Sequence, residues 1–186
     1  MREIAGKVVS AEKMEIARLK TELAKTRMER DILKKATTYL AVVIDLFSRQ
    51  VVGFAMSERM TRQLVIDVLR MAWFRRRPTN GLIFHSDRGS QYASGDFQKQ
   101  LVTFGMKGSM SRKGDCWDNA VTETLFGSLK VERMHGMHFA TRRQAKDEVI
   151  DSLQFYNHRR LHSMLGYLSP MAFEKKRLAD KERLAA

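Results

Sequence analysis

Short apolar runs and amphipathic stretches alternate along the chain from residue 37 onward. Two runs rich in Thr, Tyr, Val and Ile cover residues 37–45 and 50–56, and the four residues 46–49 between them can turn the chain. This pattern predicts a β-hairpin. A third, short apolar run over residues 82–85 predicts another strand, which ends just before Asp87.

Four further segments carry apolar residues at helical spacing. The predicted helices cover residues 61–74, 94–105, 118–133 and 141–158. Thr61 and Ser94 are suitable N-caps for the first two, because their hydroxyls can accept the free N–H groups of a helix start. Residues 107–115 are small, polar and basic, and predict a mobile loop. Strands first and helices interleaved later indicate an α/β layer architecture.

The first 36 residues have a different character, with strong helix formers over residues 11–35 and no aromatic or proline. Apolar residues recur at helical spacing, but Thr26 and Arg30 interrupt the heptad pattern of a coiled coil. We therefore expect an amphipathic helical segment over 1–36, a core with a C-terminal helix over 37–174, and a basic tail over 175–186.

Charge and composition narrow the class of protein. The chain has 34 Lys and Arg against 21 Asp and Glu, a net charge of +13, which favours an anionic partner. The single Cys116 excludes an intramolecular disulfide and disfavours a Cys-based zinc site. No apolar run approaches the roughly 18 residues of a membrane span, and the N-terminus has no apolar signal region. We expect a cytoplasmic protein without a membrane partner.

Two acids stand where they could hold a metal ion. Asp87 follows a strand directly, where carboxylates can lie at the edge of a sheet, although Asp-Arg-Gly is also a good turn sequence that Asp87 would cap. Glu123 lies in the first turns of the helix over 118–133. A first-turn Glu more often complements the helix dipole or faces solvent.

Taken together with their neighbours, these acids resemble a known family. Residues His85–Tyr92, Ser109–Ala120, Tyr156–Ser163 and Gly166–Pro170 resemble, in order, motifs of the DDE-type transposases of bacterial insertion sequences, which are relatives of retroviral integrases. Glu123 then falls on the family's catalytic Glu and Asp87 on its second catalytic Asp, with 35 residues between them. The resemblance covers about residues 37–174.

The resemblance implies a ribonuclease-H-like integrase core that cleaves and rejoins DNA. Such an in-line displacement at phosphorus uses two Mg²⁺ or Mn²⁺ ions, about 3.5–4 Å apart, which stabilise the attacking and leaving oxygens. Carboxylates suit these ions, so Asp87 and Glu123 are the expected catalytic and metal-binding residues. The residues expected to contact DNA are Arg88, Ser111, Arg112, Lys113, Lys130, Arg159 and Arg160.

The clusters of basic residues have two possible interpretations, solvated helix ends or phosphate contacts. Arg75–Arg77, Arg112–Lys113, Arg142–Arg143 and Arg159–Arg160 are each consistent with solvated helix ends. From residue 37 onward, Lys and Arg outnumber Asp and Glu by nine, and this collective excess indicates phosphate contact that is largely independent of DNA sequence.

The chain departs from the family at its first carboxylate. That Asp lies on the family's first strand, whereas the hairpin from residue 37 resembles the second and third strands, and Asp45 matches a non-catalytic acid. Residues 28–36 instead resemble the end of the helical, DNA-binding upstream protein of such elements, so the chain resembles an internal-deletion fusion. Asp31 is the nearest upstream acid, but it lies in a helical pattern.

Loss of the first strand predicts an incomplete core. In the family this strand is central, so its loss unpairs the backbone of both neighbouring strands. We expect strand transfer to be absent or very weak and the metal to be weakly bound. A non-catalytic module that binds DNA, copies of itself or the intact transposase proteins of the element is the alternative, and an unfolded product remains a third.

Overall fold

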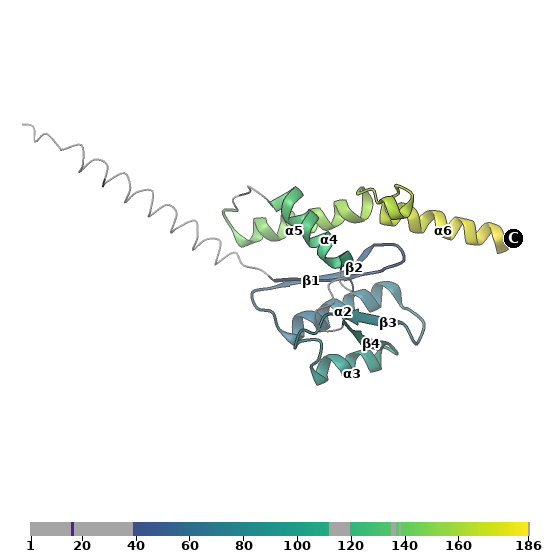
Figure 1. Ribbon diagram of the computed structural model, residues 1–186, viewed down its shortest axis with the longest axis horizontal. Coiled ribbons are helices and arrows are strands. Elements are labelled where there is room, and N and C mark those ends of the chain that lie inside the picture. The colour runs from purple at the N-terminus through teal and green to yellow at the C-terminus, as the bar shows by residue number, and fades with distance from the viewer. Residues whose placement is uncertain (1–15, 17–38, 112–119, 135–136, 138, 186) are drawn as a thin grey trace, which may run out of the picture. The chain divides into compact units, whose positions relative to one another are not determined.

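The computed structural model describes residues 16, 39–111, 120–134, 137 and 139–185 (Figure 1). The chain divides into two compact units, Met1–Thr37 and Thr38–Ala186. The helix expected over 11–35 belongs to the first unit and lies outside the described residues, except for Ile16, which is helical and exposed. All the described strands belong to the second unit.

The second unit begins with the predicted hairpin. Strand β1 (Tyr39–Ile44) pairs antiparallel with β2 (Val51–Ser57), with one irregularity between Val43 and Ile44. The carboxylate of Asp45 closes the turn, because its Oδ1 accepts the N–H of Phe47 at 2.9 Å and that of Ser48 at 3.3 Å. The hairpin prediction is confirmed.

Helix α2 (Arg62–Arg76) packs on this hairpin. Its start is the predicted one, since the Thr61 hydroxyl accepts the Leu64 N–H at 3.3 Å, and it ends two residues beyond the predicted Phe74. Gly53 of β2 allows the close approach. A Cβ at this position would lie 2.6 Å from the carbonyl oxygen of Val68, which is closer than real Cβ atoms come.

The second pair of strands corrects a prediction. Strand β3 (Ile83–Ser86) and strand β4 (Lys107–Met110) pair in parallel, and helix α3 (Gly95–Thr103) connects them. Residues 107–110 were expected in a mobile loop, and that expectation is wrong. These four residues lack a β-branched pattern of their own, and pairing with β3 makes them a strand. Residues 112–119 lie outside the described residues.

The C-terminal half is helical. Helix α4 (Ala120–Ser128) continues into a π-helix (Leu129–Met134), where the sequence predicts one α-helix over 118–133. Helix α5 (Arg142–His158) begins at Thr141, which forms a capping box with Gln144. A short 3₁₀ helix (Ser163–Leu165) leads to helix α6 (Pro170–Ala185). Residues 175–185, expected as a basic tail, continue α6.

The described strands form two separate sheets, β1–β2 and β3–β4. One core lies under both sheets, because Ala41 of β1 and Phe84 of β3 pack with α2 and α3. The other face of the hairpin packs on α4 and α5 through Leu125, Val149 and Leu153 (Figure 1). Among the described strands, none joins β1 to β3, and this is the position at which the sequence analysis expects the family's first strand to be missing.

Candidate functional site

Asp87 lies directly after β3 and is exposed. Its Oδ1 accepts the N–H of Gly89 at 2.7 Å, which is the turn interaction that the sequence allowed as an alternative. In the described part of the chain this is the one hydrogen bond of the Asp87 carboxylate. The turn role and a ligand role are therefore compatible, since a carboxylate has two oxygens.

The negative charge of Asp87 affects the ionisation of its neighbour Tyr92. Burial of the Tyr92 side chain and the nearby negative charge of Asp87 together raise the pKa of the phenol to about 12. The ring also packs edge-on against Phe97, with centroids 5.4 Å apart. Tyr92 thus stays neutral and anchors the turn that carries Asp87 to the core.

Glu123 lies in the first turn of α4 and is exposed. Among the described residues, no hydrogen bond or ion pair engages its carboxylate. Two residues further along α4, and so on a different side of the helix, Leu125 is buried in the core against Val149 and Leu153. The helix is therefore fixed by its apolar side, and the Glu123 carboxylate remains available on the exposed side.

The donor chemistry of Asp87 and Glu123 fits a divalent cation, because both offer the hard oxygen ligands that Mg²⁺ and Mn²⁺ prefer. Their number falls short of the family's three carboxylates. Within the described ranges, no three His, Cys, Asp or Glu side chains gather into a group that could hold a metal ion.

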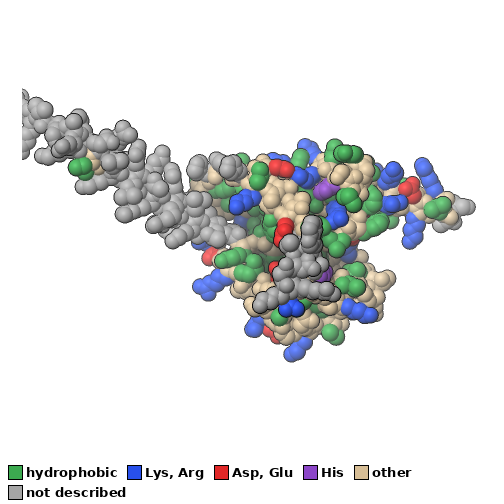
Figure 2. Space-filling model, in the orientation of Figure 1, with side chains coloured by type: hydrophobic (Ala, Val, Ile, Leu, Met, Phe, Trp, Pro, Cys, Tyr) green, Lys and Arg blue, Asp and Glu red, His purple; other side chains and the backbone are tan. Residues whose placement is uncertain are grey.

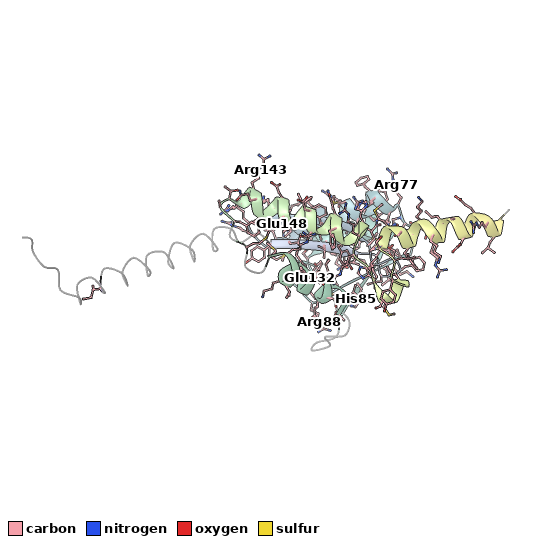
Figure 3. The ribbon with its side chains drawn as sticks, turned by 90° about the horizontal axis from the view of Figure 1, so that it is seen from above. Arg77, His85, Arg88, Glu132, Arg143 and Glu148 are labelled. Atoms are coloured by element: carbon pink, nitrogen blue, oxygen red, sulfur yellow. The ribbon has the colours of Figure 1, made fainter. Side chains whose placement is uncertain are left out.

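A hydrogen-bond network connects the ends of β3 and β4 beside Asp87. His85 lies 3.0 Å from the Ser109 hydroxyl through Nδ1 and 3.1 Å from the Ser111 hydroxyl through Nε2. The Ser111 hydroxyl also donates to the Ser86 carbonyl at 3.3 Å. Arg88 donates its Nε–H to the Ser111 carbonyl at 2.9 Å, and Figure 3 shows His85 and Arg88 on the same side of the molecule. The network fixes the strand end that precedes Asp87.

The predicted DNA contacts lie in different surroundings. Ser111 is only 4% exposed, so its side chain is engaged inside the protein, whereas Arg88, Lys130 and Arg159 are exposed. Arg160 forms an ion pair with Glu132 of the π-helix. Arg112 and Lys113 lie outside the described residues.

Sequence reasoning missed a charged cluster at the end of α2. Arg76, at the end of α2, forms ion pairs with Glu174 of α6 and with Asp45 of the hairpin turn. Burial by itself raises the pKa of Glu174. The hydrogen bonds from Arg76 and Ser48 and the positive charge of Arg76 outweigh that effect and hold the pKa below its ordinary value. The sequence holds no signal for this pair, since its members are 98 residues apart.

The fold of the second unit is that of retroviral integrase catalytic cores. The chain is similar to the catalytic core domain of BIV integrase, with a TM-score of 0.59 and 16% identity over 78% of this chain and 90% of that one. It is also similar to a chain of the simian T-cell lymphotropic virus intasome in complex with PP2A regulatory subunit B56 gamma, with a TM-score of 0.60 and 18% identity over 72% of this chain and 47% of that one. These similarities confirm the predicted ribonuclease-H-like fold class.

Sequence similarity then identifies the family. Two models described as integrase core domain match residues 24–116 and 123–178. The chain is 54% identical over 143 residues to the transposase InsF for insertion sequence IS3A of Escherichia coli K12, and 46% identical to the transposase for insertion sequence element IS904 of Lactococcus lactis IL1403. The chain therefore belongs to the integrase core family, among the DDE-type insertion-sequence transposases.

The chain spans about half the length of these relatives. The match covers 76% of this chain but 49% of InsF and 56% of the IS904 transposase. The first family match begins at residue 24, thirteen residues before the expected start of the core. None of the helices in the described ranges combines the length and apolar character needed to cross a bilayer.

Proposed function

We propose that this chain is a DNA-binding remnant of an insertion-sequence transposase that holds a divalent cation through Asp87 and Glu123 but performs little or no strand transfer. The observation that carries the proposal is the interrupted sheet. β1 and β3 share a core without a described strand between them, as expected if an internal deletion removed the strand that bears the first carboxylate.

A bound cation would stabilise the attacking and leaving oxygens of a phosphodiester exchange. The residues of this chain would hold the cation and attract the DNA. Asp87 and Glu123 offer carboxylate oxygens, the network around His85 fixes the backbone that carries Asp87, and exposed basic residues such as Lys130 and Arg159 attract the phosphates. With two carboxylates instead of three, the cation has fewer fixed ligands, so its binding and its orientation both weaken.

Metal binding and DNA cleavage are measured separately. Electron paramagnetic resonance of Mn²⁺ should show weak binding that Asp87→Asn and Glu123→Gln each reduce. Asp147→Asn, which alters a well-exposed acid on α5, should leave Mn²⁺ binding unchanged. Equal Mn²⁺ binding by all four proteins would contradict the proposed ligands.

Cleavage of terminal inverted-repeat DNA with Mg²⁺ tests the missing carboxylate. We expect little or no product from the unaltered chain. Robust cleavage that Asp87→Asn abolishes would show that a third acid is present after all. Asp31→Asn would then test the nearest acid upstream of the hairpin, which lies inside the family match.

A second function is supported by the division of the chain at residue 37. A separate N-terminal unit is consistent with a module that binds the intact transposase proteins of the element and inhibits them. A pull-down with full-length transposase, using the whole chain and residues 37–186, separates the contributions of the two units. Absence of association in both cases would eliminate this function.

A further inference from the structure

Helix α2 ends in a cluster of aromatic side chains at the surface. Trp73 stacks on Phe104, with ring centroids 4.5 Å apart and planes 10° apart, and meets Phe74 edge-on at 5.1 Å. Trp73 and Phe104 are half-buried, whereas Phe74 is 59% exposed. With Arg77, these three residues form what we call the aromatic platform.

Arg77 has an unusual backbone for its residue type. It caps α2 in the left-handed region, with φ 42° and ψ 58°, and its N–H donates to the Trp73 carbonyl at 2.7 Å. Glycine is the usual residue at such a position, because a Cβ there is sterically unfavourable. The Arg77 side chain makes cation–π contacts from this cap, because its guanidinium lies 5.8 Å from the Trp73 ring centroid and 5.9 Å from that of Phe74.

Three arginines lie around the platform. Arg70 and Arg75 lie on the last two turns of α2 and Arg77 caps it, and none of them forms an ion pair with an acid in the described part of the chain. Arg70 instead donates to the Gln100 side chain at 3.0 Å, and Arg75 to the Val51 carbonyl at 3.4 Å. The neighbouring Arg76 pairs with Asp45 and Glu174. Two copies of this face would repel each other, whereas a polyanion complements it.

We propose that the aromatic platform binds unpaired nucleotides of single-stranded DNA. A base would stack on the exposed part of Phe74, and Arg75 and Arg77 would contact the flanking phosphates. Aromatic rings combined with arginines are how proteins bind single strands without sequence preference, because every base has a π-face. In Figure 3, Arg77 lies on the opposite side of the view from His85 and Arg88, so this surface is separate from the surroundings of Asp87.

Tryptophan fluorescence tests the proposal directly, because the chain has two tryptophans and Trp117→Phe leaves Trp73 as the reporter. Titration of this variant with an oligothymidine should quench the Trp73 emission. Adding Phe74→Ala should weaken binding about fivefold or more, the effect of losing one stacked base. The titration is done without a metal ion. Its result therefore does not depend on metal binding by Asp87 and Glu123, and the single-strand proposal can fail while the proposed function stands.

Matched variants separate binding from folding. Arg77→Gly places the preferred residue at the left-handed cap, so we expect a thermal transition at least as high as that of the parent and weaker oligothymidine binding. Arg59→Ala removes an exposed arginine just before the start of α2, and Leu178→Ala an exposed apolar side chain of α6. Both controls should bind oligothymidine as the parent does.

Five results would overturn the proposal, of which the first four come from the binding titrations. These are no quenching by oligothymidine, unchanged affinity of the Phe74→Ala variant, equal quenching by duplex DNA of the same length, and equal quenching by polyglutamate. The last would indicate an acidic protein as partner. Sedimentation of the parent and Phe74→Ala proteins tests whether the platform binds a second copy of the chain. A dimer that the substitution dissociates would assign the platform to that second copy.

Discussion

Arg76 connects three segments that are far apart in the sequence. Its guanidinium donates to the Gln50 side chain at 2.7 Å and to the Ser48 hydroxyl at 3.3 Å, and it forms ion pairs with Asp45 and Glu174. The side chains of Arg76 and Glu174 are both mostly buried. In the sequence, Arg76 is one of three consecutive arginines that fit a solvated helix end equally well. Only the folded chain reveals its acidic partners.

Glu174→Gln should lower the free energy of unfolding at pH 7 by about 1–3 kcal/mol, since it leaves the Arg76 charge without its main partner. The pKa of Glu174 is lower in the folded protein than its ordinary value of 4.5. The stabilisation is therefore complete above about pH 4.5 and is lost as the pH falls through the lowered pKa. Urea unfolding of both proteins from pH 3 to pH 7 measures the difference.

The control for this experiment is Glu182→Gln, which alters an exposed acid of α6. Its unfolding free energy should stay within about 0.5 kcal/mol of the parent. A Glu174→Gln effect that is the same at pH 3 and pH 7 would mean that the ion pair does not carry it.

At the scale of elements, the sequence predicts those helices and strands whose own residues show a typical pattern. It does not predict those whose conformation depends on a neighbouring strand. The hairpin strands are rich in Thr, Tyr, Val and Ile, and α2 and α5 have helical patterns and N-caps, and all three elements are confirmed. Strand β4 reads as a loop because Lys107–Met110 lacks a strand pattern, and its conformation comes from four paired residues of β3. The widening of α4 into a π-helix at Leu129 is likewise absent from the periodicity.

Two glycines should respond in opposite ways to the same substitution. Gly53→Ala places a Cβ 2.6 Å from the Val68 carbonyl oxygen and 3.0 Å from the Ala72 nitrogen, so β2 and α2 must separate. We expect a loss of about 1–3 kcal/mol of unfolding free energy. At Gly127 of α4 a Cβ meets nothing within 4 Å, so Gly127→Ala should stabilise the protein by about 0.5–1 kcal/mol. Urea unfolding compares the two, and equal effects would contradict the packing.

At the scale of the whole molecule, the excess of positive charge is the dominant property. The net charge is +13, and Figure 2 shows Lys and Arg side chains spread over the visible face of the second unit instead of in one stripe. Such a distribution supports many weak phosphate contacts and little sequence readout.

Binding of duplex DNA should therefore depend strongly on salt and weakly on sequence. If as few as two phosphates are neutralised, raising the salt from 50 to 200 mM lowers the affinity about tenfold, and more contacts give a steeper fall. Fluorescence anisotropy with inverted-repeat and scrambled duplexes measures both dependences. A salt-independent affinity, or one confined to a single sequence, would contradict this expectation.

The sequence by itself determined the family and the order of most elements. Motifs around Asp87 and Glu123 and the local periodicity of the hairpin and helices are encoded in neighbouring residues, so they can be recognised without a structure. The tertiary structure alone decided that β4 is a strand, that Ser111 is buried, that Arg76 pairs with Glu174 and that the sheet is divided in two. Each of these depends on backbone or side-chain partners distant in sequence, and no local pattern records which distant groups meet.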